Sequence, residues 1–399
     1  MTRFTNTPII QSLLDTDLYK FTMMQVVFHQ FPGAHVEYAF RCRTKNVNLV
    51  PFIGEIQDEI DAYCALQFTP SELAVLNKMR FIKPDFTDFL ELYRPRARHV
   101  KVVAVADEPG AIDIHVEGPW WATIPFEVPC LAIVNEVYFR NTYDMAERER
   151  LGEQRLFAKI EAAKTNPAWS NFSFNEFGTR RRMSHAWQDR VLSILKEECP
   201  RQLVGTSNVF FADKHQLTVM GTMAHEYLQA FQALGPRLRD SQTAALDAWV
   251  KEYQGDLGIA LTDVIGMDAF LNDFNLYYTK LFDGLRHDSG SPFEWADKAL
   301  AHYERHRVDA RQKRLVFSDG LTFDTALELQ AYVGQRAQAS FGIGTYLTND
   351  TGVPALNVVM KMVRCNGQDV AKLSDSPGKT MCQNPGYVDY LKSVFGVTA

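Results

Sequence analysis

Closely spaced cysteines are absent from this chain of 399 residues. The six cysteines are Cys42, Cys64, Cys130, Cys199, Cys365 and Cys382. None of them forms a CxxC pair, a spacing that is common in zinc sites and disulfide frameworks. We therefore expect free, mostly buried thiols and a reducing, cytoplasmic environment.

Long apolar runs are also missing. Residues 1–17 lack the basic start and apolar stretch of a signal peptide, and no later run is long enough to span a bilayer. The net charge of -6 gives no general attraction to nucleic acid or to anionic membranes. The sequence therefore predicts neither a membrane nor a nucleic-acid partner.

Several nucleotide and hydrolase signatures are lacking as well. There is no GxxxxGK[ST] loop, no GxGxxG spacing and no GxSxG elbow. Because these motifs mark Walker-type phosphate loops, dinucleotide sites and serine hydrolases, each of those classes is disfavoured. Any ATP must be held in another way.

Apolar and polar residues alternate in the amino-terminal part, as they do in half-buried strands. The pattern includes Val36, Tyr38 and Phe40, and it recurs at residues 112–117. The Asp-Glu-Pro-Gly turn at 107–110 predicts a hairpin over residues 100–118. We expect an α+β arrangement here.

Beyond about residue 130 the pattern changes to apolar run, polar loop and helix, recurring at about 20 to 40 residues. The expected helices are 183–198, 223–234, 267–274, 293–306 and 325–333. Parallel βα units can form either a barrel or an open doubly wound sheet. In both, the carboxyl ends of the strands would bring Asp263, Asp288 and Asp319 to one face.

A last hairpin is predicted around Asn366 and Gly367, a dipeptide that favours a two-residue turn. An antiparallel pair does not fit a parallel barrel. We expect it to return to the amino-terminal part.

Three consecutive arginines, Arg180 to Arg182, precede a predicted helix. Guanidinium groups bind phosphate through paired hydrogen bonds, and a helix start adds a favourable dipole. The motif predicts a phosphorylated substrate, although a solvated basic turn would look the same.

His225 follows the Gly221-Thr222 pair in the segment Gly-Thr-Met-Ala-His-Glu. Thr222 is the predicted helix N-cap, which would place His225 in the first turn. The helix dipole would lower the pKa of that histidine and keep the ring neutral, as a nucleophile requires. A structural histidine is the alternative.

Glycines and carboxylates follow successive predicted strands, at 262–263, 286–290, 318–320 and 342–345. Glycine lets the backbone approach a ligand, and carboxylates can hold ribose hydroxyls or a hydrated Mg²⁺. Together these loops predict a sugar-phosphate site, although each alone could be an ordinary turn.

Six ordered motifs resemble the bacterial form of the nicotinate phosphoribosyltransferase family. They are DTDLYK at 15–20, FGTRR at 177–181, GTSN at 205–208, GTMAHE at 221–226, LRHDSG at 285–290 and FGIGT at 341–345. The resemblance extends from about residue 8 to the closing LSDSPGK at 373–379. Tyr227 stands where relatives have tryptophan.

The resemblance implies a type II phosphoribosyltransferase fold, in which an irregular α/β barrel joins an α/β sandwich domain. The expected division is 1–130 for the sandwich, 131–352 for the catalytic barrel and 353–399 for a hairpin returning to the sandwich. It also implies a homodimer with shared active sites.

By the same resemblance, His225 would be a phosphohistidine, and Asp263 would orient it or lie near the metal. Arg286 and Thr222 would hold nicotinate, with Phe177 and the partner's Tyr19 on its ring. Arg180 and Thr345 would contact phosphates, and Asp288 the ribose. Further substrate-binding residues would be Asn208, Asp319, Gly320, Gly342 and Gly344.

The implied reaction joins nicotinate and phosphoribosyl pyrophosphate into nicotinate mononucleotide for NAD salvage, with Mg²⁺ as cofactor and ATP as co-substrate. No metal ligand is assigned. Nicotinamide or quinolinate as substrate, or a catalytically silent binding protein, are the alternatives that the residues leave open.

Overall fold

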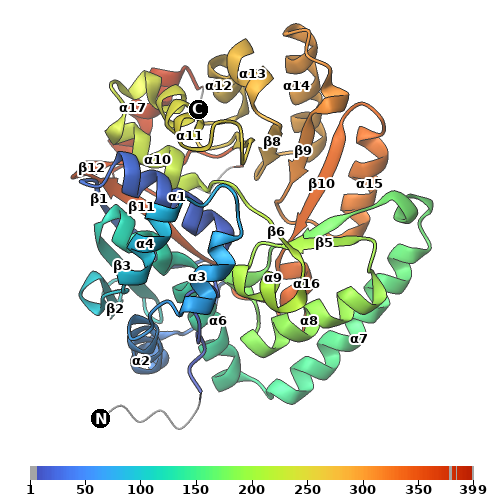
Figure 1. The fold of residues 1–399 in the computed structure, drawn as a ribbon. Coiled ribbons are helices and arrows are strands. Elements are labelled where there is room, and N and C mark those ends of the chain that lie inside the picture. Colours follow the sequence, from blue (N-terminus) through green and yellow to red (C-terminus); the bar gives the residue numbers. More distant parts are fainter. Residues whose placement is uncertain (1–6, 377–379, 383, 398–399) are drawn as a thin grey trace.

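Two β-sheets with surrounding helices make up the protein (Figure 1). The computed structural model describes residues 7–376, 380–382 and 384–397. One sheet has five antiparallel strands and the other seven parallel strands. No helix in these described ranges is long and apolar enough to cross a membrane.

The antiparallel sheet has the strand order β12-β11-β1-β3-β2. Its strands are β1 (His35–Cys42), β2 (Val100–Ala104), β3 (Ile112–Pro119), β11 (Val358–Cys365) and β12 (Gln368–Asp369). Both predicted hairpins are confirmed, since β2 pairs with β3 and β11 with β12. β11 also lies antiparallel to β1, so the end of the chain does return to the amino-terminal part.

The helices of the amino-terminal part are α1 (Leu18–Gln30), α2 (Ile53–Cys64), α3 (Pro70–Asn77), α4 (Pro84–Leu92), α5 (Trp120–Thr123) and α6 (Glu127–Thr142). The first ten residues of α1 are all buried, so this helix is a core element. Its start is tied to the parallel sheet, because the Leu18 amide donates to the carbonyl of Ser207. Tyr19 and Lys20 therefore lie where the two halves of the protein meet.

The parallel sheet has the strand order β6-β5-β4-β10-β9-β8-β7. Its strands are β4 (Phe174–Glu176), β5 (Leu203–Thr206), β6 (Thr218–Val219), β7 (Ile259–Leu261), β8 (Gly284–His287), β9 (Arg314–Phe317) and β10 (Gln338–Ile343). Strands adjacent in the sequence are neighbours except β6 and β7, and the last strand, β10, pairs with the first, β4. This circular order is that of a barrel and not of a doubly wound sheet. The barrel is irregular, because β6 and β7 do not pair with each other.

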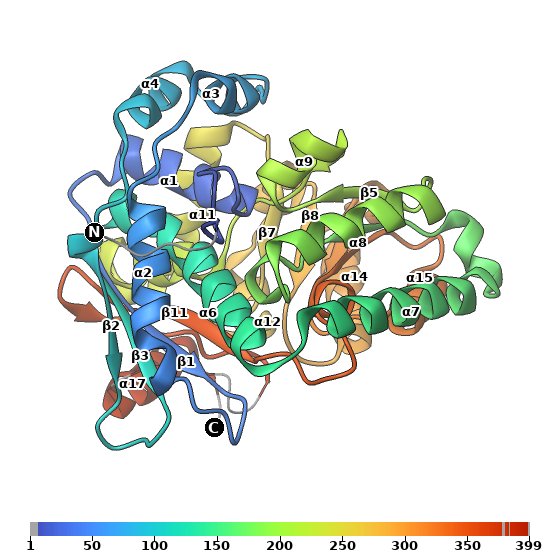
Figure 2. The ribbon, with the colours of Figure 1, turned by 90° about the horizontal axis from the view of Figure 1, so that it is seen from below.

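The remaining helices are α7 (Met145–Lys164), α8 (His185–Glu198), α9 (Val209–His215), α10 (His225–Leu234), α11 (Ser241–Tyr253), α12 (Met267–Asp273), α13 (Leu276–Leu281), α14 (Pro292–Arg305), α15 (Phe323–Val333), α16 (Thr345–Thr348) and α17 (Pro385–Phe395). Side chains of Ser184, Asn208, Ser291 and Thr322 cap α8, α9, α14 and α15. The five helices expected from the sequence are present, with ends that differ by one or two residues. Figure 2 shows α7, α8 and α15 together on the barrel side.

The predicted N-cap of α10 is wrong. The helix begins at His225 after Ala224, with no side-chain cap. The Thr222 hydroxyl instead donates to the carbonyl of Ile259 in β7, 2.9 Å away. Thr222 thus bridges the gap between the segment after β6 and the far edge of the parallel sheet.

Candidate active site

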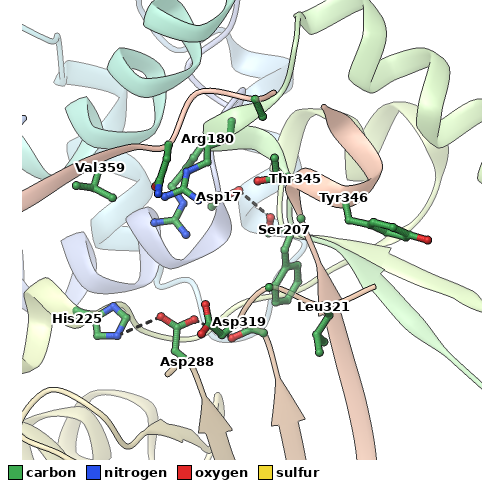
Figure 3. A pocket seen from close by; sticks show the side chains of 18 of the residues that line it. Asp17, Arg180, Ser207, His225, Asp288, Asp319, Leu321, Thr345, Tyr346 and Val359 are labelled. Atoms are coloured by element: carbon green, nitrogen blue, oxygen red, sulfur yellow. Dashed lines mark hydrogen bonds and ion pairs between the residues drawn. The ribbon is translucent and has the colours of Figure 1, made fainter. Parts of the chain in front are cut away.

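A pocket of about 610 Å³ lies between the two sheets (Figure 3). This volume falls within the usual range for small-molecule sites. Its walls come from α1, from β11 and from the loops that follow the barrel strands. Ten residues expected from the sequence line it: Tyr19, Phe177, Arg180, His225, Arg286, Asp288, Asp319, Gly320, Gly344 and Thr345.

His225 is the first residue of α10, and its side chain is 12% exposed at the pocket wall. Its Nε2 lies 2.9 Å from an oxygen of Asp263 and 3.3 Å from one of Asp288. Burial, together with the positive charge of Lys372, lowers the pKa of His225 to about 4 despite these two carboxylates. The ring is therefore neutral at physiological pH.

Asp263 follows β7 and lies beneath the pocket, 1% exposed. One oxygen faces His225, and the other lies 2.6 Å from both Ser289 Oγ and Lys372 Nζ. Burial raises the pKa of Asp263, but His225 and Lys372 outweigh it and hold this pKa well below its usual range. Asp263 is an ionised group that fixes the histidine from behind.

Asp288 and Asp319 follow β8 and β9 and line the same pocket wall. Figure 3 shows these two carboxylates facing the cavity beside His225. Ser318 Oγ lies 3.0 Å from Asp288, which fixes one of its oxygens. The three acids expected at one face therefore lie together, because parallel strands end at the same rim.

The three arginines divide between two tasks. Arg180 and Arg181, in a short 3₁₀ helix (Thr179–Arg181), line the pocket opposite the acids. Arg182 points away from it and is fully buried, with two 2.7 Å bonds to the carboxylate of Asp15. A solvated basic turn is thus excluded, and only the first two guanidinium groups can meet a ligand.

Phe177 and Tyr19 supply aromatic surface to the pocket. The Phe177 ring lies directly on Gly342, where an added Cβ would come within 2.2 Å of it. Tyr19 is 9% exposed and lines the pocket of its own chain. Arg286 donates to the Met223 carbonyl through one nitrogen, while its buried Nε has no hydrogen-bond partner within the described ranges.

Four expected residues do not line the pocket: Thr222, Asn208, Asp263 and Gly342. Asn208 caps α9 and donates to Asp15, so it supports the arginine loop. Gly342 lies behind Phe177, and Asp263 behind His225. These residues act on the site through their neighbours.

The sequence reasoning missed two lysines that line the pocket, Lys361 in β11 and Lys372 after β12. Burial beside other cations lowers the pKa of Lys361 to about 7. The available signal was a lysine inside an otherwise apolar strand, between Met360 and Met362. Asp17, Arg43 and Ser207 also line the pocket and were not singled out.

Comparison with known proteins gives one family over nearly the whole chain. The signature of the nicotinate phosphoribosyltransferase (NAPRTase) family matches residues 172–399, and that of its N-terminal domain matches residues 14–135. Nicotinate phosphoribosyltransferases of Xanthomonas campestris pv. campestris (strain B100) and Burkholderia ambifaria are each 57% identical. Each alignment covers 98% of this chain and 97% of the relative.

Solved structures agree with these sequence relatives. The nicotinate phosphoribosyltransferase of Vibrio cholerae superimposes with a TM-score of 0.93 at 38% identity, covering 98% of this chain and 94% of that one. The enzyme of Porphyromonas gingivalis gives 0.89 at 36% identity, over 97% and 100%. The fold, the site loops and these matches lead to one conclusion: the chain belongs to the nicotinate phosphoribosyltransferase family.

Proposed function

We propose that the pocket beside His225 carries out the reaction of this family, with the residue roles given below. Nicotinate phosphoribosyltransferases form nicotinate mononucleotide and pyrophosphate for NAD salvage. The observation that supports these roles is the position of His225, which lies between two carboxylates and faces two arginines across one cavity. Titratable groups gathered in this way are typical of active sites.

Nicotinate would lie against Phe177 and Tyr19, with its carboxylate toward Arg286. The ring nitrogen is already a nucleophile, so the protein need only orient it by stacking and by charge. Arg286 suits this task, because its buried Nε has no partner within the described ranges. This supports an anionic pyridine over nicotinamide.

The phosphoribosyl donor would extend between the arginines and the acids. Attack by the pyridine nitrogen on the anomeric carbon breaks the bond to pyrophosphate, leaving positive charge on the ribose and negative charge on the leaving group. Asp288 lies where it can stabilise the ribose, and Arg180, Arg181 and Thr345 lie where they can bind phosphate oxygens. No general base is needed.

Mg²⁺ fits the carboxylates of the pocket wall. His225, Asp263 and Asp288 are close enough together to hold an ion, but Asp263 is already engaged by Lys372 and Ser289. Asp288 and Asp319 offer the oxygen ligands that Mg²⁺ prefers. Held there, the ion would neutralise charge on the leaving pyrophosphate.

ATP would phosphorylate His225 at Nδ1. In the neutral ring only one nitrogen carries a proton, and Nε2 must carry it in order to donate to Asp263. The lone pair of Nδ1 is then available to attack the γ-phosphorus, with ADP as the leaving group. The phosphorylated ring becomes cationic, and the ionised Asp263 stabilises it. Water later releases phosphate and restores the histidine.

ATP hydrolysis lies outside the bond exchange, so it must act by changing affinities. A phosphate on His225 places a dianion at the edge of the pocket, which can order the loops and tighten binding of the phosphoribosyl donor. Loss of that phosphate would then favour release of product.

One coupled assay tests this proposal: nicotinate, phosphoribosyl pyrophosphate and Mg²⁺, with and without ATP. We expect His225→Ala to lose ATPase activity and ATP stimulation while retaining slow transfer. His115→Ala, on the half-exposed face of β3, is the control and should behave as wild type. ATP stimulation that persists in His225→Ala would contradict the phosphohistidine.

We also propose a homodimer and a division of the chain at residues 1–130, 131–352 and 353–399. The pairing of β11 with β1 supports assigning the last segment to the amino-terminal sheet. For the dimer we propose active sites shared between the subunits, with Tyr19 of one subunit reaching the pyridine ring bound in the other.

A further inference from the structure

A line of four charged side chains runs beneath the pocket from the start of α10 to the arginine loop. Lys20 lies at its centre, with Nζ 2.6 Å from Glu226 and 2.6 Å from Glu127. The second oxygen of Glu127 lies 3.4 Å from Arg180. Glu226 directly follows His225, so the line joins the residue after the histidine to a phosphate-binding arginine.

Three of the four groups are almost fully excluded from water. The side chains of Lys20, Glu226 and Glu127 are 1%, 6% and 11% exposed. Burying such ions is costly, and an apolar replacement of similar shape is often as stable or more stable. Stability therefore does not account for this arrangement, whereas buried charges do fix the relative geometry of the elements that carry them.

The line also crosses the main division of the molecule. Lys20 is on α1, Glu127 begins α6, Glu226 is in α10 and Arg180 is in the loop after β4. Tyr19, next to Lys20, lines the pocket. A shift of α10 would thus move Glu226 relative to Lys20. The distance between the Lys20 ammonium group and the Glu127 carboxylate would then change as well.

We propose that Lys20 is a positioning residue that couples the phosphorylation of His225 to the binding of phosphoribosyl pyrophosphate at Arg180. The proposal rests on the proposed function, because it takes His225 as the site of phosphorylation and Arg180 as a phosphate ligand. When Glu226 moves with the start of α10, the strength of the ion pair between Lys20 and Glu127 changes. Glu127 in turn sets how far the Arg180 guanidinium extends into the pocket.

The test uses a variant that removes the charges and keeps the shapes: Lys20→Met with Glu127→Gln and Glu226→Gln. Removing only Lys20 would leave the buried Glu226 carboxylate without its cation and Glu127 with Arg180 alone, a change that by itself destabilises the fold. A matched control is Arg140→Met with Glu55→Gln and Glu59→Gln. Arg140 also joins two carboxylates and lies on α6, but none of these residues lines the pocket.

The readout is the KM for phosphoribosyl pyrophosphate without ATP divided by the KM with ATP. We expect the neutral triple variant to accept phosphate from ATP on His225, while this ratio falls to about one. The control triple should keep the wild-type ratio, which typical coupling between sites would place at about 5 to 150. A phosphorylated neutral triple with the wild-type ratio would overturn the inference.

A single variant gives a second, ATP-independent measurement. Without ATP, Glu127→Gln should raise the KM for phosphoribosyl pyrophosphate by about fivefold or more, since the charged acceptor that holds Arg180 becomes a neutral amide and the bond weakens. The KM for nicotinate should change by less than about twofold, which a general structural defect would not predict. Equal rises in both KM values would count against the inference.

These measurements separate the inference from the proposed function. A wild-type ratio of one would contradict ATP coupling through His225, and the proposed function would fail in that part. If ATP lowers the KM for phosphoribosyl pyrophosphate equally in the wild type and in the neutral triple variant, the proposed function stands. That result would remove only the role of Lys20.

Discussion

Asp263 holds three donors at once, and its two oxygens have different tasks. One accepts from His225 Nε2, while the other meets Ser289 and Lys372. Because the carboxylate only accepts hydrogen bonds, it selects the tautomer with the proton on Nε2. The nitrogen of His225 that we propose to react is thus selected by a residue that does not line the pocket.

Asp263→Asn should therefore lower the rate of phosphohistidine formation by about 10² to 10⁴, the range seen when a carboxylate behind a catalytic histidine becomes an amide. An amide must turn its NH₂ either toward His225, favouring the wrong tautomer, or toward Lys372, repelling the ammonium group. The measurement is the acid-labile label that the protein takes up from γ-labelled ATP, since the N–P bond of phosphohistidine hydrolyses in acid. Asp309→Asn, at an exposed site, is the control and should keep the wild-type rate. A rate within about threefold of wild type in Asp263→Asn would contradict the assigned role.

Sequence reasoning at this scale found most of the acids and arginines but misjudged two partners. It grouped Arg182 with Arg180, although the Arg182 side chain is bound to Asp15, which is 167 positions away in the sequence. It also assigned Thr222 to the helix cap, although its hydroxyl reaches β7. Both errors concern bonds between segments distant in the sequence, which local motifs do not encode.

The end of β10 fixes the aromatic wall of the site. The amide of Phe177 donates to the Ile343 carbonyl, and the Phe177 ring covers Gly342 with no room for a Cβ. Glycine at 342 is required by close approach and not by an unusual backbone angle.

Gly342→Ala should displace the Phe177 ring and raise the KM for nicotinate by about tenfold, with a smaller effect on the KM for phosphoribosyl pyrophosphate. The physical reason is the loss of a stacking contact that normally contributes about 0.5 to 1.5 kcal/mol beyond burial. Initial rates with each substrate varied in turn would measure it. Gly54→Ala, in α2, is the control, because this glycine has open space around it and no positive φ angle. Equal effects on both substrates would contradict the assignment.

Most elements could be predicted from local patterns. The hairpin at residues 107–110, the turn at Asn366 and the helices after each barrel strand all follow from periodicity and turn chemistry. The strand order could not be predicted, because barrel and doubly wound sheets use the same βα units. Only the pairing of β10 with β4 decides between them.

The whole molecule is organised around a pocket to which both sheets contribute. The acids come from the parallel sheet, while Lys361 comes from the antiparallel one. A ligand that spans the pocket would therefore bind only the assembled molecule.

We expect light scattering to give a mass of about twice 45.4 kDa for the proposed dimer. Co-expression of Tyr19→Ala and His225→Ala subunits with different tags should restore activity in the mixed dimer, because one of its two shared sites would then hold an intact Tyr19 and an intact His225. No recovery would contradict the shared sites. The matching control is a mixed dimer of wild type and His225→Ala, which should keep about half the activity. Recovery in the doubly mutant mixture would show that pockets are shared between subunits.

The sequence by itself determined the elements, the glycine turns and the acids that follow successive strands, because these depend on neighbours along the chain. The tertiary structure alone decided which cations meet those acids. Lys372 contacts Asp263 across 109 positions and Lys20 contacts Glu226 across 206. A lysine carries no local sign of its partner, since its charge has a function only after folding brings an opposite charge within reach and removes the water between them.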